Sequence, residues 1–293
     1  MSQTPPSGGF LERYFKLSEN GTTVRTEAIA CFTTFLTMCY IIIVNPLILS
    51  ETGMDHGAVF VATCLTAAIG CFVMGAVANY PIALAPGMGL NAYFTYAVCL
   101  GMGVPWQVAL AAVFVSGLLF FALSFSNIRE ALINAIPMTL KLAIGGGIGL
   151  FLALVGLKTS GIIVANEATY VSLGNLQTHG PLFTLFGLLL IVIMHHYKVR
   201  GAIIISILSV TALSTLLGYN QIVGVVGAVP SIAPTFMQMD FKDLFTPAMI
   251  GVIFVFFLVD LFDSTGTLVG VANRAGLLQD GKLPRLKRAL LAD

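Results

Sequence analysis

A succession of long apolar segments constrains the fold of this chain more than any other feature. A helix needs about 20 apolar residues to cross the hydrocarbon core of a bilayer. A soluble domain carries about 25% charged residues, whereas this chain has 9% charged and 57% hydrophobic residues. The sequence therefore predicts an all-α polytopic membrane protein. Eight segments approach or reach the spanning length: residues 28–49, 58–79, 82–102, 106–125, 142–165, 181–197, 201–219 and 246–270.

The segments between the apolar runs differ in character. Residues 1–26 are polar and form an N-terminal tail, and residues 271–293 form a polar C-terminal segment. Residues 126–141 place Arg129 and Glu130 beside apolar side chains, which is typical of an amphipathic helix at the membrane surface. Residues 220–245 form a long connection with polar residues and proline.

Lysine and arginine are distributed unevenly among these connections, and this predicts the orientation. If the N-terminus is cytoplasmic, twelve of the 14 basic residues lie on the cytoplasmic side, and only Lys158 and Lys242 lie on the other. Basic residues concentrate on the cytoplasmic side of membrane proteins, so we expect this topology with eight spans. The formal net charge of +1 argues against a nucleic-acid partner, and the expected surroundings are membrane lipid.

Asp260 and Asp263 are the two acids that fall within an apolar segment, whereas the other eleven of the 13 acids fall outside. An Asp at the centre of a membrane helix costs about 2.5–3.5 kcal/mol. Residues three apart share one face of a helix, and Thr267 continues that face. Like charges this close oppose joint ionisation, so one carboxyl should bind a proton readily. We expect a hydrated cavity that binds a polar solute, a cation or protons; the alternative is a structural anchor between helices.

The third apolar segment is interrupted by Pro86, Gly87 and Gly89. Proline removes a backbone donor and glycine favours non-helical dihedrals, so we expect a short extended piece and then a half-helix beginning near Gly87. Broken helices at membrane depth mark binding sites. Asn91 lies one turn into the half-helix and offers both donor and acceptor. The alternative is a proline kink in which Asn91 bonds a neighbouring helix.

Other chemistry has little support in the residues. The sequence contains no Ser-His-Asp, HExxH or Walker pattern, which argues against a hydrolase or an ATP-driven pump, and no metal-ligand spacing. Threonines of the first segment, including Thr34, fit packing better than ligand contact, because hydroxyls in membrane helices mostly bond their own backbone. We therefore expect no cofactor and no metal.

Three stretches together resemble a known family. They are TVRTE at 23–27 with TTFLTM at 33–38 and VNP at 44–46, then APGMGLNA at 85–92, then DLFDSTGTL at 260–268. The chain resembles the AzgA-like purine permeases, a branch of the nucleobase–ascorbate transporter superfamily, over nearly its whole length. The resemblance implies import of adenine, guanine or hypoxanthine together with a proton, across the cell inner membrane. The coupling ion is then H⁺.

The resemblance also implies an architecture of fourteen spans in two inverted seven-span repeats. A core domain of spans 1–4 and 8–11 packs against a gate domain of spans 5–7 and 12–14. Residues 27–125 and 246–270 would then belong to the core, and residues 142–219 to the gate. Substrate binds where the broken third and tenth spans meet the eighth, and a homodimer forms through the gate domain.

Site residues follow from the motif positions. Asn91, with Gly89 and Leu90 beside it, matches the ligand contact of the third span. Asp260 and Asp263 match the acidic pair that the family uses for purine binding and proton coupling. A purine presents N–H donors, which a carboxylate accepts with charge-assisted strength. The supporting residues of this assignment are Thr34 and Thr267.

The chain departs from the family pattern by stopping at Asp293, before the ninth to fourteenth spans. We therefore expect a C-terminally truncated portion of a permease, with its site only half encoded. One alternative is a non-transporting membrane fragment whose acids stabilise packing. Another is an anion transporter of the related sulfate-carrier fold, which two buried carboxylates disfavour. The preferred purine does not follow from the sequence.

Overall fold

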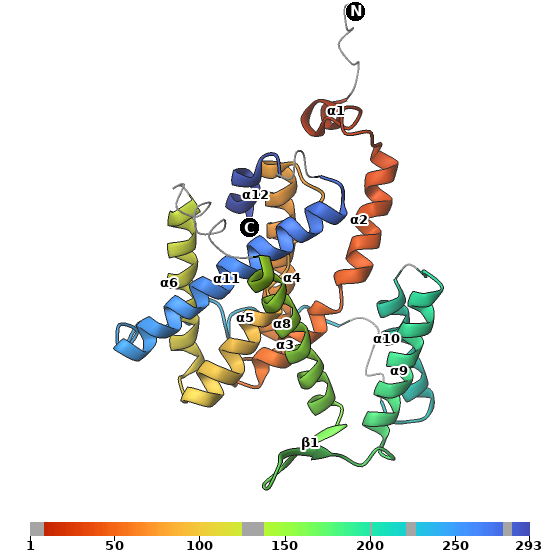
Figure 1. Cartoon of the computed structure of the whole chain (residues 1–293), viewed down its shortest axis with the longest axis vertical. Helices are drawn as coiled ribbons and strands as arrows, with labels where there is room; N and C mark the ends of the chain where they lie inside the picture. The colour runs from red at the N-terminus through yellow and green to blue at the C-terminus, as the bar shows by residue number, and fades with distance from the viewer. Residues whose placement is uncertain (1–8, 125–137, 200, 221–226, 278–282) are drawn as a thin grey trace, which may run out of the picture.

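The structure is a computed structural model that describes residues 9–124, 138–199, 201–220, 227–277 and 283–293. Nearly all of its regular structure is helical, with two short strands between α8 and α9 (Figure 1). The elements are α1 (Phe10–Phe15), α2 (Val24–Met38), α3 (Ile41–Ser50), α4 (His56–Val73), the π-helix η1 (Met74–Ala78), α5 (Met88–Ala92), the π-helix η2 (Tyr93–Gly101), α6 (Trp106–Ser124), α8 (Met138–Thr159), β1 (Ile163–Asn166), β2 (Tyr170–Leu173), α9 (His179–His196), α10 (Ala202–Leu216), α11 (Pro247–Arg274) and α12 (Leu286–Ala292).

Each of the eight apolar segments forms helix, so the chain is a multi-pass membrane protein. Within the described residues, five helical stretches are long and apolar enough to cross a membrane: Val24–Ser50, His56–Ala78, Trp106–Leu123, His179–His196 and Pro247–Ala272. Shorter apolar helices cover Gly149–Thr159 and Ala202–Leu216. Within the third segment, only α5 and η2 are helical, because the first part of the segment forms no helix.

The fifth apolar segment ends earlier than the sequence predicted, and the expectation of an all-α chain is wrong there. The helix stops at Thr159 rather than at residue 165, because Gly161 adopts φ +76°. The N–H of Ile162 donates to the carbonyl of Leu157, and the N–H of Gly161 donates to that of Lys158; this pattern closes a helix C-terminus. The following residues form the antiparallel pair β1 and β2, with Ile163 opposite Leu173.

Two short helices also lie where the sequence predicted only polar ends. α1 lies within the tail of residues 1–26, and α12 lies within residues 271–293. The amphipathic helix expected over residues 126–141 lies largely outside the described residues, and its last residues, 138–141, belong to α8. Neither short helix is detectable from periodicity, because fewer than eight residues carry too little pattern.

α11 packs against α6, α8 and α5. Two clusters of buried apolar side chains both include it: Leu261 belongs to the cluster shared with η1 and α12, and Phe256 to the one shared with η2 and α6. The ring of Phe256 also packs edge-on against Tyr93, with centroids 5.1 Å apart. The eighth span therefore contacts the second half of the third span directly.

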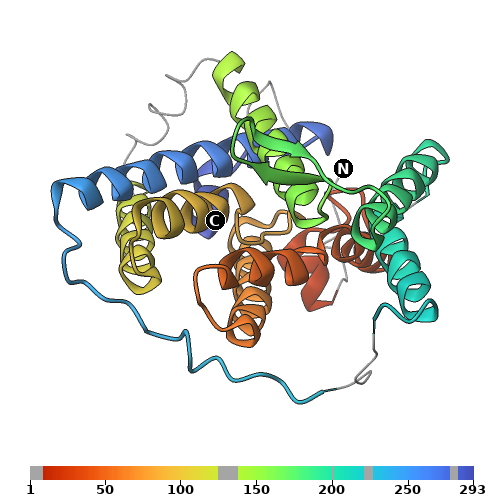
Figure 2. The same cartoon turned by 90° about the horizontal axis from the view of Figure 1, so that it is seen from below.

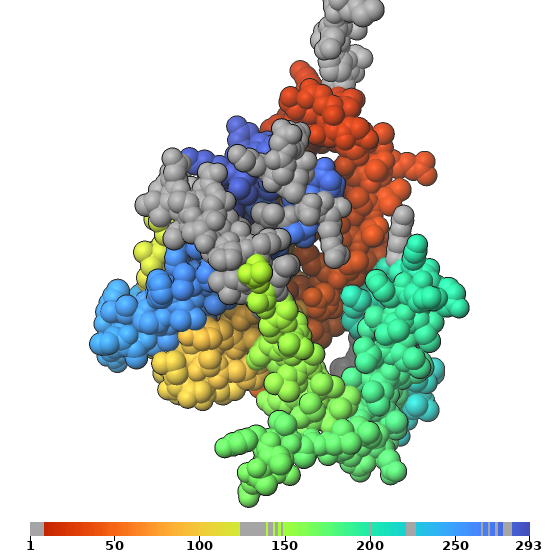
Figure 3. All heavy atoms as spheres, in the orientation of Figure 1, coloured from red at the N-terminus to blue at the C-terminus, as the bar shows by residue number. Residues whose placement is uncertain are grey.

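α9 and α10 pack against each other and form a lobe beside α2 (Figure 3). Their close approach depends on Gly187, whose carbonyl accepts a 2.8 Å hydrogen bond from the Ser206 hydroxyl. An added Cβ on Gly187 would lie 3.1 Å from Cγ2 of Val210. Figure 2 shows that the connection from α10 to α11 follows the outside of the molecule; its described part, residues 227–246, contains no helix or strand. The division into core and gate domains stays a prediction.

Candidate functional site

The third span is broken as its prolines and glycines predict. The chain leaves η1 at Asn79, which adopts a left-handed conformation with φ +52°, and residues 79–87 form no helix. The half-helix α5 then begins at Met88 with Gly87 as its N-cap, and continues as η2 to Gly101. The backbone N–H of Asn91 donates to the carbonyl of Gly87 over 3.1 Å. The expected extended piece and half-helix are both confirmed.

The extended piece finds a hydrogen-bonding partner on the second span. The backbone N–H of Leu84 donates to Sγ of Cys71 over 3.2 Å, and the Cys71 thiol lies 3.3 Å from the Leu84 carbonyl oxygen. Unpaired backbone groups are costly at membrane depth, so these contacts help to explain how a non-helical segment persists there. Cys71 is thus a structural residue that the sequence indicated only as a small apolar side chain.

Asp263 lies directly against the start of the half-helix. A Cβ built on Gly87 would lie 3.0 Å from Oδ2 of Asp263. The carboxyl therefore approaches the end of α5 where the first N–H groups have no partner within the helix. That end also carries a partial positive charge, which favours a negative group. Asp263 is half-buried, and no ion pair among the described residues includes it.

Asn91 is bonded to the first span. Its side-chain N–H donates to Oδ1 of Asn45, and the Asn45 amide donates to the Thr63 hydroxyl over 2.8 Å. Thr63 in turn donates to the carbonyl of Val59 over 2.7 Å. Asn45 and Thr63 are almost fully buried, at 3% and 2% exposure. This chain ties the third, first and second spans together, as the alternative interpretation of Asn91 predicted, although an Asn amide retains further donor and acceptor capacity.

The remaining residues of the sequence-based site are placed less centrally. Asp260 is half-buried one turn before Asp263 on α11, and Gly89 and Leu90 form the middle of α5. The Thr267 side chain is exposed, and its hydroxyl donates to the carbonyl of Asp263 over 2.6 Å. Thr34 is half-buried in α2, and no hydrogen bond among the described residues links it to Asp263 or Asn91. Their proposed roles stay predictions.

The arrangement offers polar groups of complementary kinds at membrane depth. A carboxyl on α11 approaches the start of α5, where the first backbone N–H groups have no partner within the helix, in hydrophobic surroundings. Together they can accept hydrogen bonds from a small heterocycle and donate hydrogen bonds to it, and the carboxyl can carry a proton. Across the described residues there is no group of three or more His, Cys, Asp or Glu that could hold a metal ion.

Gly87 and Asn45 are the two residues that sequence reasoning undervalued. Gly87 was expected to break the helix, but its contact with Asp263 depends on tertiary structure. Asn45 stood out as a polar residue near the end of the first apolar run, and its burial beside Asn91 explains its presence. Gly266 and Gly270 follow the acids on α11, and an added Cβ at either would meet nothing within 4 Å among the described residues.

Several known proteins are similar to this chain over nearly its whole length. Adenine permease AdeP of Escherichia coli (strain K12) is 49% identical over 292 residues, which cover 99% of this chain and 66% of the relative. Guanine/hypoxanthine permease PbuG of Bacillus subtilis (strain 168) is 48% identical over 97% of this chain and 67% of its own length. Nucleobase transporter PlAzg2 of Paenibacillus larvae is 38% identical over 92% of this chain and 54% of its own length.

The chain thus spans about two thirds of the length of the first two relatives. These relatives are named as permeases and transporters rather than as enzymes. The Permease family model Xan_ur_permease matches residues 25–293, which include both the broken third span and the acids of α11. The chain therefore belongs to the Permease family, in the branch that contains adenine and guanine/hypoxanthine permeases.

Proposed function

We propose that this chain acts in a permease that imports purine nucleobases (adenine, hypoxanthine or guanine) together with a proton. The observation that carries the proposal is the approach of Asp263 to Gly87, where a Cβ would lie 3.0 Å from Oδ2. This contact brings an ionisable group next to a broken helix at membrane depth. The names of the relatives supply the class of substrate.

In this proposal the purine binds between α5 and α11. Asp263 accepts an N–H of the base, and the backbone N–H groups at the start of α5, with Gly89 and Leu90 beside them, donate to its ring nitrogens or carbonyl oxygen. Asn91 orients the base while it remains bonded to Asn45. Asp260 and Asp263 are the groups that carry the coupled proton in this proposal. Proton binding then accompanies purine uptake.

Uptake assays with single substitutions test this function. The protein is expressed, with any sequence that its gene encodes beyond Asp293, in cells that lack their own purine permeases, and uptake of radiolabelled adenine, hypoxanthine and guanine is measured across external pH. A hydrogen bond to a charged group is worth about 1.5–3 kcal/mol. Asp263→Asn should therefore lower uptake by about 10- to 100-fold and abolish its pH dependence at normal membrane levels.

Asp243→Asn is the matched control, because Asp243 is exposed in the connection before α11 and has a φ of +57° that asparagine tolerates. It should leave uptake unchanged. Normal, pH-dependent purine uptake by Asp263→Asn would remove this carboxyl from the mechanism. Failure of the unsubstituted protein to take up any purine would remove the transport proposal itself.

A second candidate, a membrane segment whose polar groups only stabilise packing, is favoured by the bond between Asn91 and Asn45. It predicts that Asp263→Asn lowers thermal stability and membrane level together, and that neither this variant nor the unsubstituted protein takes up purine. The two candidates therefore differ in uptake normalised to the amount of protein in the membrane.

The placement in the membrane is part of the same proposal. The bias of lysine and arginine puts the N-terminus, α1 and α12 on the cytoplasmic side of the cell inner membrane. The complete protein would carry fourteen spans in two inverted repeats and form a homodimer through its gate domain. Labelling of single cysteines introduced at the exposed Lys16 and Tyr170 from either side of sealed vesicles tests the orientation.

A further inference from the structure

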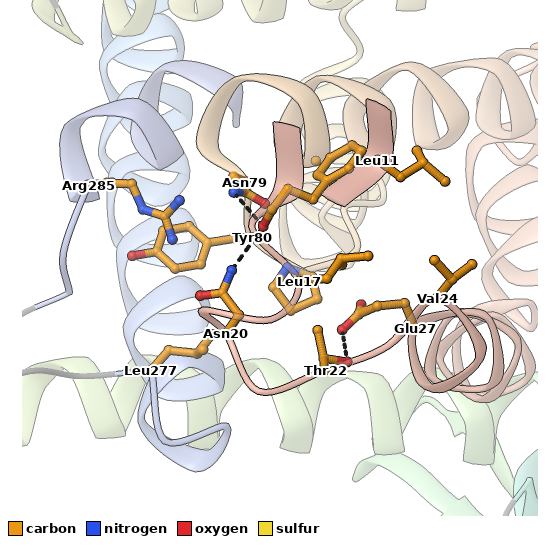
Figure 4. A pocket seen from close by; sticks show the side chains of 13 residues that line it. Leu11, Leu17, Asn20, Thr22, Val24, Glu27, Asn79, Tyr80, Leu277 and Arg285 are labelled. Carbon is orange, nitrogen blue, oxygen red and sulfur yellow. Dashed lines mark hydrogen bonds between the residues drawn. The ribbon is translucent and has the colours of Figure 1, made fainter. Parts of the chain in front are cut away.

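A cavity of about 460 Å³ lies where three spans end on the same side of the molecule. It is lined by the segment from α1 to the start of α2, by the end of η1 with the residues that follow it, and by Leu277 and Arg285 (Figure 4). Figure 1 shows α1 and α12 at this end of the molecule. The cavity is therefore at the level where helices leave the hydrocarbon core.

One wall of this cavity is apolar. It contains Leu11, Phe15 and Leu17 from the N-terminal segment, with Pro81 and Leu277 from the spans behind them. Its size falls within the range of about 300–1,000 Å³ that is usual for small-molecule sites. The wall thus offers a surface for a hydrocarbon group at the edge of the membrane.

The other side of the cavity opens into a cationic hollow of about 700 Å³, which shares Asn20, Asn79 and Arg285 with it and adds Lys16 and Arg288. Lys16 is paired with Glu19 at 2.9 Å. No ion pair among the described residues includes Arg285 or Arg288. Two guanidinium groups therefore face the hollow without an acidic partner in the described part of the chain.

The guanidinium group of Arg285 is held in place by the ring of Tyr80. The guanidinium carbon of Arg285 lies 4.6 Å from the centroid of the Tyr80 ring, and the Tyr80 hydroxyl donates to the carbonyl of Pro284. Glu27 also lines the cavity, but it accepts a 2.8 Å hydrogen bond from Thr22 and lies away from Arg285 in Figure 4. The positive charge is thus concentrated at the end formed by Arg285 and Arg288.

The N-terminal segment is fixed over the cavity by specific hydrogen bonds. The Tyr14 hydroxyl donates to the carbonyl of Ala76 over 2.7 Å. The side-chain amides of Asn79 and Asn20 both donate to the carbonyl of Phe15, over 3.3 and 3.0 Å. A segment anchored in this way forms one side of a defined cavity rather than a loose flap.

We propose that this cavity is a binding site for an anionic phospholipid, with the headgroup phosphate on Arg285 and Arg288 and the first acyl carbons against Leu11, Phe15 and Leu17. Arginine binds phosphate oxygens through a planar fork of N–H donors. Basic pockets beside spanning helices are suited to anionic headgroups, and the apolar wall distinguishes a lipid from a free anion. With the N-terminus on the cytoplasmic side, as proposed above, the lipid lies in the cytoplasmic leaflet. The lipid site does not depend on the proposed purine transport.

Native mass spectrometry of the purified full-length protein tests the site, with phosphatidylglycerol and phosphatidylcholine supplied in equal amounts. The unsubstituted protein should retain phosphatidylglycerol preferentially. Each basic residue near a membrane surface contributes about 1 kcal/mol, or about fivefold, so Arg285→Gln combined with Arg288→Gln should weaken retention by at least about tenfold. Lys287→Gln is the matched control, because Lys287 is exposed on the same helix and does not line the cavity; it should have no effect.

Two further variants distinguish a lipid headgroup from free inorganic phosphate and control for misfolding. Leu17→Gln should weaken phosphatidylglycerol retention while leaving binding of inorganic phosphate as it was, since only a lipid needs the apolar wall. Arg285→Lys keeps the charge and should retain most of the lipid preference. Equal retention of both lipids, an equal loss in Lys287→Gln, or displacement of the lipid by millimolar inorganic phosphate would each overturn the proposal.

Discussion

Oδ2 of Asp263 lies so close to Gly87 that a Cβ at that position would approach it to 3.0 Å. This contact joins the break in the third span to the acidic face of the eighth. Few real Cβ contacts are as close as this, so even a methyl group would displace the carboxyl by a few tenths of an ångström. Space rather than backbone conformation restricts this position, since the φ of −70° at Gly87 is open to any residue.

Gly87→Ala should therefore impair transport more than folding. The carboxyl must move away from the start of α5, and a misplaced ligand group costs about 1–3 kcal/mol, or about 5- to 100-fold in uptake. Uptake of radiolabelled purine per molecule in the membrane measures the effect. Gly117→Ala in α6 is the control, because an added Cβ there meets nothing within 4 Å among the described residues. Equal uptake by the two variants would show that the contact does not position Asp263.

Thr63→Val should destabilise the protein, because it removes the hydroxyl that accepts from the buried Asn45 amide. A buried polar group left without its partner costs about 1–3 kcal/mol. The midpoint of thermal unfolding in detergent should fall measurably. Thr66→Val provides the comparison one turn along: Thr66 is exposed and its hydroxyl donates to the carbonyl of Ala62 within α4. A similar midpoint for both variants would argue against the importance of the Asn91–Asn45–Thr63 chain.

Thr267→Val should have little effect on uptake, within about twofold, even though Thr267 shares a face with the acids. Its side chain is exposed and its hydroxyl is engaged by the carbonyl of Asp263; such a bond within a helix contributes little to stability. Kinetics of purine uptake by Thr267→Val and Thr267→Ser measure this. A large rise in KM that serine restores would instead place this hydroxyl on the substrate.

Lys158→Gln should change stability by less than about 1 kcal/mol, because exposed ion pairs contribute little. Nζ of Lys158 lies 3.8 Å from Oε2 of Glu51, and the side chains of Lys158 and Glu51 are 62% and 35% exposed. Tyr96 also donates to Glu51 over 2.8 Å, so Glu51 keeps a partner after the substitution. Thermal unfolding of Lys158→Gln at low and high salt measures the effect. A loss of several kcal/mol that salt does not alter would contradict the surface character of this pair.

The sequence by itself determined the membrane character of the chain, the positions of its eight apolar helices and the break at Pro86 and Gly87. These features depend on local composition and backbone chemistry: a bilayer requires long apolar helices, and proline and glycine interrupt them wherever they lie. The acids Asp260 and Asp263 were singled out for the same reason, because a carboxyl in an apolar segment is costly without a function or a partner.

Only the tertiary structure decided which groups meet. Nothing in the spacing of Gly87 and Asp263 indicates that they touch. The sequence likewise does not indicate that the Asn91 amide donates to Asn45. The short helices α1 and α12 and the strands β1 and β2 also escaped prediction. Segments of four to seven residues carry too little periodicity to identify, and they are stabilised by contacts with distant parts of the chain, such as Tyr14 with Ala76.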